Sequence, residues 1–195
     1  MKKIVVLMLI VALFLLVKFT AAQTREQTTI QTATFAKGPL ADAVTVSYLN
    51  FPWGEVTFST IEKGTKGSYY GERTWPFAQM DNKVPLTFEG TKLIPGQYAL
   101  VITPGGENKP MSLSVVPFEG PTFLKAGNIF STAPKGEAVY TKDISFDTVD
   151  ALADHMKIDL APTASGFDLV LNYGNRKLTK SFETSTAAPK TATAK

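Results

Sequence analysis

The stretch FDLVLNYGNRKLTKSF, residues 167–182, decides the fold class of this protein. Large apolar residues occupy every second position from Phe167 to Tyr173 before Gly174-Asn175, and Leu178 and Phe182 continue the alternation after it, a pattern typical of two strands joined by a tight turn. Glycine at the first central position favours a type II′ turn, whose twist matches that of paired strands. The sequence therefore predicts a hairpin in which Phe167 lies opposite Phe182 on the core face.

The same register defines two further facing pairs. Leu171 falls opposite Leu178, while Leu169 falls opposite Lys180, which mismatches an apolar and a charged side chain. A lysine can bury its methylene stem and keep its ammonium group in water. We therefore expect Lys180 at the rim of the core, with its stem covering apolar surface.

Other parts of the chain carry similar alternations, separated by turns rich in glycine and proline. They predict strands at residues 44–49, 56–61, 85–88, 97–102, 111–116, 138–141 and 156–160, with Gly105-Gly106 in a hairpin turn. One apolar stripe has helical spacing instead, and it predicts a short helix near 148–155. Many short strands with a single helix favour an all-β fold, an antiparallel β-sandwich or a related open barrel, over a parallel α/β sheet.

The N-terminal residues 1–22 have the layout of a secretory signal peptide. Two lysines precede the apolar run Ile4–Val17, and Thr20-Ala21-Ala22 places small residues before a cut at Gln23. The run is shorter than the roughly 20 residues that a spanning helix needs. Lys18 directly after it would suit an uncleaved anchor, but the small-residue site favours cleavage. We expect a periplasmic or secreted protein with no membrane span after signal cleavage.

Composition divides the rest of the chain into three parts. Residues 23–34 are polar and predict a flexible lead-in, and residues 185–195 are low in complexity and predict a disordered tail. Between them, residues 35–184 predict a single domain. The chain has no cysteine, so its core must hold the fold without disulfides.

The formal charge of +3 arises entirely from the targeting segment. Lys2, Lys3 and Lys18 lie there, so the remaining 17 basic residues match the 17 acidic ones. A neutral domain lacks the basic surface that nucleic acid binding requires. We therefore expect no nucleic acid partner.

Residues 91–106, TKLIPGQYALVITPGG, are the most distinctive stretch. Together with the C-terminal strands, they resemble a family of exported bacterial β-proteins known only as a domain of unknown function. Its members carry Gly-Lys-x-Leu-x-Ala-Gly-x-Tyr-x-Leu, then a Pro-Gly turn, then a hairpin. The resemblance covers roughly residues 44–182 and implies an exported β-domain. The family's Trp-Arg-x-Gly-Ala-Asn motif is not retained, because residues 74–82 read TWPFAQMDN and only Trp75 and Asn82 correspond.

A Leu-x-Pro-Gly-x-Tyr segment also resembles parts of transthyretin-like and collagen-adhesin repeat domains. Pro95-Gly96 favours a tight turn, after which Tyr98 and Leu100 share one face of the next strand. We expect this segment to mark architecture rather than activity.

Candidate functional residues are few. His155 is the single histidine, and no nucleophile motif, thiolate ligand or calcium loop accompanies it, so we expect neither a cofactor nor a metal. Aromatic residues beside turns are the better candidates, because exposed rings bind sugars or partner proteins. The candidate ligand-binding residues are Trp53, Tyr69, Tyr70, Arg73, Trp75 and Phe77. The alternative interpretation is that these rings close the open end of the sandwich.

Two functions are compatible with these residues. The first is a non-enzymatic binding or structural module of the cell envelope, which takes a glycan, a small apolar ligand or an envelope protein. The alternative is a hydrolase of unknown type that uses His155 and a carboxylate. The scarcity of polar catalytic groups favours the first.

Overall fold

The computed structural model describes residues 28–107, 109–126, 132 and 134–184, so the predicted signal peptide and C-terminal tail lie outside the described residues. In the described part, the strands form a six-stranded sheet in the order β1-β2-β3-β6-β7-β8 and a four-stranded sheet in the order β5-β4-β10-β9. All pairings are antiparallel. Buried side chains from both sheets form one core cluster. The predicted all-β sandwich is confirmed.

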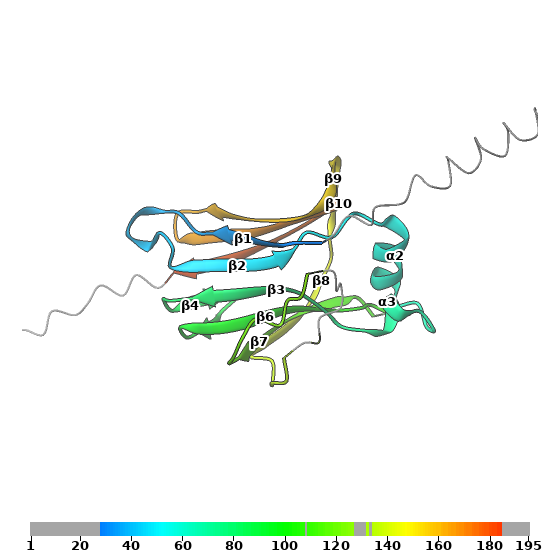
Figure 1. The fold of residues 1–195 in the computed structure, drawn as a ribbon, viewed down its shortest axis with the longest axis horizontal. Coiled ribbons are helices and arrows are strands. Elements are labelled where there is room, and N and C mark those ends of the chain that lie inside the picture. The colour runs from blue at the N-terminus through cyan, green and yellow to red at the C-terminus, as the bar shows by residue number, and fades with distance from the viewer. Residues whose placement is uncertain (1–27, 108, 127–131, 133, 185–195) are drawn as a thin grey trace, which may run out of the picture.

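The six-stranded sheet consists of β1 (Ile30–Thr34), β2 (Val44–Leu49), β3 (Trp75–Asn82), β6 (Gly96–Thr103), β7 (Met111–Phe118) and β8 (Tyr140–Ile144). The other sheet consists of β4 (Leu86–Phe88), β5 (Thr91–Leu93), β9 (Asp147–Pro162) and β10 (Gly166–Thr184). The helical elements are η1 (Gly38–Leu40), α2 (Glu55–Lys63) and α3 (Tyr69–Glu72). Figure 1 shows α2 and α3 together at one end of the sandwich.

Strand β10 doubles back on itself at Gly174. Its 19 residues would span about 60 Å if extended. Instead, Thr184 N donates to Ser165 O at 2.9 Å, and the rings of Phe167 and Phe182 stack with their centroids 5.1 Å apart. β10 therefore contains the predicted hairpin. β9 pairs along its first arm and, past the turn, with Arg176 and Lys177, and β4 pairs with the end of its second arm.

The turn of this hairpin has the expected chemistry. Gly174 has a positive φ of +60°, and Asn175 does not have a positive φ. A type II′ turn requires this combination. Leu169 is buried on the core face. The facing Lys180 side chain is 15% exposed, and its ammonium lies 3.0 Å from the Glu89 carboxylate. The predicted register and the rim position of Lys180 are confirmed.

A row of aromatic rings crosses the core between the two sheets. Phe35 packs on Phe167 with 5.3 Å between ring centroids, and Phe167 stacks on Phe182. Phe182 in turn stacks on Phe88 at 4.4 Å, and Phe88 contacts Tyr140 of β8 at 4.5 Å. The C-terminal hairpin thus joins strands that are far apart in sequence.

Glu89 links the two sheets on the outside of this row. It forms the β4–β5 turn with Gly90, and both have positive φ, 44° and 84°. Its carboxylate accepts hydrogen bonds from Tyr140 at 2.6 Å, Lys142 at 2.9 Å and Lys180 at 3.0 Å. The hydrogen bond from Tyr140, followed by those from the two lysines, lowers the pKa of Glu89 to about 2. Three hydrogen-bond donors from β8 and β10 thus hold the Glu89 carboxylate between the two sheets.

The strand predicted at 56–61 is wrong, because these residues form helix α2. Glu55 lies in the first turn, and Gly64 ends the helix in the left-handed conformation, with φ +56°. Phe58 and Ile61 are the buried residues, three positions apart as on a helix face, whereas Val56 is 81% exposed. The apparent alternation of apolar residues came from side chains that do not share one face.

The helix predicted near 148–155 is also wrong, because the segment belongs to strand β9. Thr148 pairs with Arg176 and Ala153 with Gly174, at the tip of the C-terminal hairpin. Leu152, expected on a buried helical stripe, is 61% exposed. An isolated helix of this length is marginal in water, so pairing with the hairpin decides the conformation.

One segment extends the six-stranded sheet beyond the prediction, and one turn of this sheet forms as predicted. Residues 30–34, expected within the flexible lead-in, form β1 and pair along β2. The Gly105-Gly106 connection is a hairpin turn as predicted, with Gly106 N donating to Lys109 O at 2.8 Å. Among the described residues, no helix is long and apolar enough to cross a membrane.

Candidate functional site

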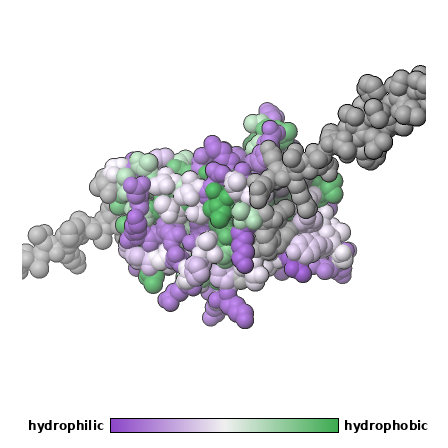
Figure 2. Space-filling model, viewed as in Figure 1, coloured by the Kyte–Doolittle hydropathy of each residue, from purple (hydrophilic) through white to green (hydrophobic). Residues whose placement is uncertain are grey.

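The exposed apolar side chains of the described residues do not form one broad apolar face. On the face drawn in Figure 2, polar and apolar side chains are interspersed over the described residues. The large apolar side chains that are exposed belong to separate elements: Ile30, Val56, Tyr69, Ile94, Val139 and Leu152. The cavities are therefore the better candidates for a ligand site.

A cavity of about 230 Å³ lies at the end of the sandwich that carries α2 and α3. Four buried side chains form its floor: Phe51, Ile61, Trp75 and Tyr173. Residues that are half-buried or exposed form its rim: Pro52, Trp53, Gly54, Thr57 and Tyr70. We call this cavity the end pocket.

Tyr173 is the centre of the end pocket. Its ring meets Trp53 edge-on at 4.8 Å and Trp75 at 5.9 Å between centroids. Its hydroxyl donates to Pro52 O at 3.0 Å. Burial raises the pKa of Tyr173 to about 12, so the phenol stays neutral across the physiological range. The two tryptophans, far apart in sequence, are joined through this one ring.

Backbone pairing with β9 fixes the segment that carries Trp53. Trp53 N donates to Asp154 O at 2.7 Å, and Met156 N donates to Phe51 O at 2.7 Å. A single bridge links Pro52 with His155 between these bonds. The strand predicted as a helix thus positions half of the pocket rim.

The Gly-rich β6–β7 connection packs against α2 and is hydrogen-bonded to it. Gly105 N donates to Ile61 O at 3.1 Å. A Cβ on Gly105 would lie 2.3 Å from Glu62 O, so only glycine allows this approach. The connection holds Ile61 in the pocket floor, and no phosphate-binding role is needed to explain its glycines.

Helix α3 divides the predicted aromatic residues between the pocket and the outer surface. Tyr70 lines the pocket, but the neighbouring Tyr69 does not and is 52% exposed. Arg73 lies over the Tyr69 ring, with its guanidinium carbon 4.3 Å from the ring centroid. The Tyr69–Arg73 pair is therefore a surface contact outside the end pocket.

Trp75 and Phe77 are not displayed on a loop as expected from the sequence. Both lie in β3 and are 2% and 1% exposed. Pro76 is tolerated because the pairing with β6 shifts between Pro76 and Ala78, where a bulge removes the need for a ladder hydrogen bond. Trp75 still contributes to the pocket floor, whereas Phe77 does not line it.

Several pocket residues were not among the sequence-based candidates: Phe51, Pro52, Gly54, Thr57, Ile61 and Tyr173. Tyr173 had a detectable signal, because it continues the inward-facing series of Phe167, Leu169 and Leu171 to the end of the hairpin arm. Thr57 and Ile61 had none while their segment was interpreted as a strand.

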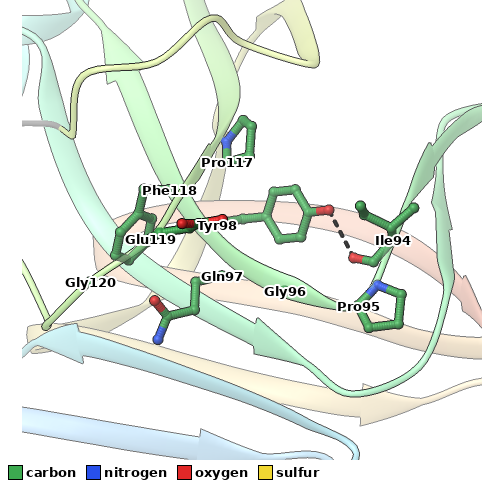
Figure 3. Close-up of a pocket in the computed structure, with 9 residues that line it drawn as sticks. All are labelled: Ile94, Pro95, Gly96, Gln97, Tyr98, Pro117, Phe118, Glu119 and Gly120. Carbon is green, nitrogen blue, oxygen red and sulfur yellow. Dashed lines mark hydrogen bonds between the residues drawn. The ribbon is translucent and has the colours of Figure 1, made fainter.

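A second, wider hollow of about 460 Å³ lies over the turn before β6 and the end of β7 (Figure 3). Its wall includes Tyr98, whose hydroxyl donates to Ile94 O at 2.8 Å. Asn82 Nδ2 donates to the same carbonyl at 3.0 Å. This arrangement is a tyrosine corner, in which a phenol closes the turn a few residues upstream. The hollow follows from the turn's architecture, and its phenol is already engaged.

His155 lies in β9, at the point where the pairing with β10 shifts register between Lys157 and Ala153. It is half-buried, and the neighbouring Asp154 is exposed. Met156 and Ile158 are buried in the core. Among the described residues, no three His, Cys, Asp or Glu side chains are grouped to hold a metal ion.

Comparison with protein-family models, with curated proteins and with solved structures finds no match. The resemblance to the exported β-protein family therefore stays a prediction.

Proposed function

We propose that this chain is an exported, non-enzymatic binding module of the cell envelope and that the end pocket is its binding site. The observation that supports this proposal best is the meeting of Trp53, Trp75 and Tyr173 around one cavity. Ligand sites are concave and mostly apolar, with a few polar groups. The end pocket has this composition.

The composition of the pocket favours binding over catalysis. General acid–base catalysis needs a group that titrates near the working pH. The residues lining the end pocket include no Asp, Glu, His, Lys or Cys, and the pKa of Tyr173 is raised away from neutrality. The alternative of a hydrolase based on His155 gains no support from this geometry.

Export is tested by fractionation of cells that produce the full chain. We expect the protein in the periplasmic or secreted fraction with Gln23 as its first residue, because Thr20-Ala21-Ala22 forms the cleavage site. N-terminal sequencing measures this directly. A start at Met1 in the membrane pellet would contradict the export proposal.

Binding is tested by tryptophan fluorescence with polysaccharides and small apolar compounds. Trp75 is buried and Trp53 is half-buried, so a ligand in the end pocket should shift the emission of Trp53 and protect it from acrylamide. The Trp53→Phe variant serves as the control, since it should lose most of the response. A response that persists in this variant would place the ligand elsewhere.

A hydrolase panel is run beside the binding assay. We expect no turnover that depends on His155, and the His155→Ala variant supplies the matched control. Hydrolysis by the wild type that disappears in this variant would overturn the non-enzymatic proposal.

A further inference from the structure

The end pocket also indicates the chemical class of its ligand, an inference that rests on the proposed function. Three kinds of ligand were compatible with the sequence: a glycan, a small apolar molecule or an envelope protein. The size, charge and polar groups of the cavity distinguish between them.

Size favours a small molecule over a protein segment. The cavity measures about 230 Å³, and an apolar cavity of about 150 Å³ takes up benzene. One or two fused rings therefore fill the end pocket, whereas a protein partner would need a far larger contact surface. The rim residues Trp53, Thr57 and Tyr70 surround this volume.

Charge favours a neutral ligand. The lining residues carry no ionised side chain, and Tyr173 stays neutral because its hydroxyl is buried and donates to Pro52 O. Moving an ion from water into such surroundings is costly without a partner of opposite charge. A carboxylate or an ammonium group would find no such partner among the lining side chains.

The small number of polar groups favours an aromatic compound over a sugar. A sugar needs several hydrogen bonds to its hydroxyl groups, and each unmade bond costs free energy on burial. The pocket has the Thr57 hydroxyl and the Tyr70 phenol on its rim, but no side-chain amide or carboxylate. The Tyr173 hydroxyl is already engaged with the backbone.

The indole of Trp75 contributes its ring rather than its N–H group. Trp75 Nε1 is buried and has no hydrogen-bond partner in the described part of the chain. This nitrogen is not accessible to solvent, so an acceptor on a ligand would not reach it without movement of the surrounding rings. Contact with aromatic faces and edges is the main interaction available.

We infer that the end pocket binds a small neutral compound with one aromatic ring or two fused ones, held between Trp53, Tyr70 and Tyr173. The floor of Trp75 and Phe51 sets the depth that the ring can reach. Edge-to-face and offset contacts with these rings provide both the affinity and the orientation.

The test is isothermal titration calorimetry of the full chain with four compounds of similar size: indole, p-cresol, benzoate and methyl β-glucoside. We expect indole and p-cresol to bind with Kd below about 1 mM, and benzoate and the glucoside to bind at least about tenfold more weakly. Benzoate tests the effect of charge on a ring, and the glucoside tests the effect of many hydroxyl groups.

Variants locate the site. Thr57→Phe should fill the pocket and weaken indole binding at least about tenfold. Val56→Ala is the control, because Val56 lies on α2 beside Thr57 but is 81% exposed and does not line the pocket. Tyr70→Ala should weaken binding, and Val56→Ala should change it by less than about twofold. Thermal melts verify that each variant folds. If Thr57→Phe does not fold, Tyr70→Ala decides the outcome.

The outcomes separate this inference from the proposed function. Equal binding of benzoate or the glucoside, or indole binding that Thr57→Phe and Tyr70→Ala leave unchanged, would overturn the inference. If a polysaccharide binds and depends on Trp53 while indole and p-cresol do not bind, the inference fails and the proposed function stands. If no compound binds, both fail.

Discussion

Gly174, at the tip of the C-terminal hairpin, lies directly against the indole of Trp53. A Cβ added to Gly174 would come within 2.1 Å of Trp53 Cδ2 and 2.2 Å of Cε2. Gly174 also has φ +60°, which a residue with a Cβ rarely adopts. The glycine that the turn requires therefore also leaves room for the Trp53 indole, which lies on the rim of the end pocket.

We expect Gly174→Ala to destabilise the protein by about 2–4 kcal/mol, since the methyl group adds overlap with Trp53 to backbone strain. Urea unfolding measures the loss. The double variant Gly174→Ala with Trp53→Ala should recover part of it relative to the sum of the single variants, because removal of the indole leaves only the strain. Strict additivity would show that the contact with Trp53 does not matter.

Phe182 should be among the most costly residues to truncate. It stacks between Phe88 at 4.4 Å and Phe167 at 5.1 Å, and it is 2% exposed. We expect Phe182→Ala to lower the free energy of unfolding by about 3–5 kcal/mol in denaturant melts. A loss under about 1 kcal/mol would be inconsistent with the stacked register.

Glu89 should make stability depend on pH in the acid range. Its folded pKa is lowered from 4.5 to about 2, so the unfolded chain binds the proton more readily between these values. The stabilisation is complete above about pH 5 and is lost as pH falls toward 2. We expect the difference in stability between wild type and Glu89→Gln, measured by thermal melts, to shrink over this interval.

Partial exposure limits the size of the Glu89 effect. The carboxylate side chain is 27% exposed, so water screens its ion pairs with Lys142 and Lys180. Glu137→Gln, at an exposed position before β8, is the control and should leave the pH profile unchanged. If Glu89→Gln also follows the wild-type profile, the carboxylate does not carry the pH dependence.

The tyrosine corner predicts a smaller but measurable loss in the free energy of unfolding. Tyr98→Phe removes the hydrogen bond to Ile94 O, but that carbonyl still accepts a hydrogen bond from Asn82 Nδ2. We expect a loss of about 1 kcal/mol, the net value of one hydrogen bond, in urea melts. Asn82→Ala should cost more, because it also removes the bond to Val84 O. A neutral Tyr98→Phe variant would mean that the phenol does not stabilise the turn.

The sequence by itself determined the elements whose structure depends on near neighbours. Alternating apolar residues and the turn chemistry of Gly174 defined the hairpin and its register. Strand β2 runs over Val44–Leu49 as expected, and Tyr98 and Leu100 are both buried on the face that Pro95-Gly96 implied. These features follow from a period of two residues and a local turn, both of which can be read over a few positions.

Tertiary structure decided the segments with two compatible local patterns. Residues 56–61 became a helix because Phe58 and Ile61 together reach the core, and residues 148–155 became a strand because the hairpin tip offers backbone partners. The end pocket likewise depends on Tyr173, which joins Trp53 to Trp75 across the fold. Contacts between residues so distant in sequence leave no periodic signal, since the packing that stabilises them exists only once both sheets have formed.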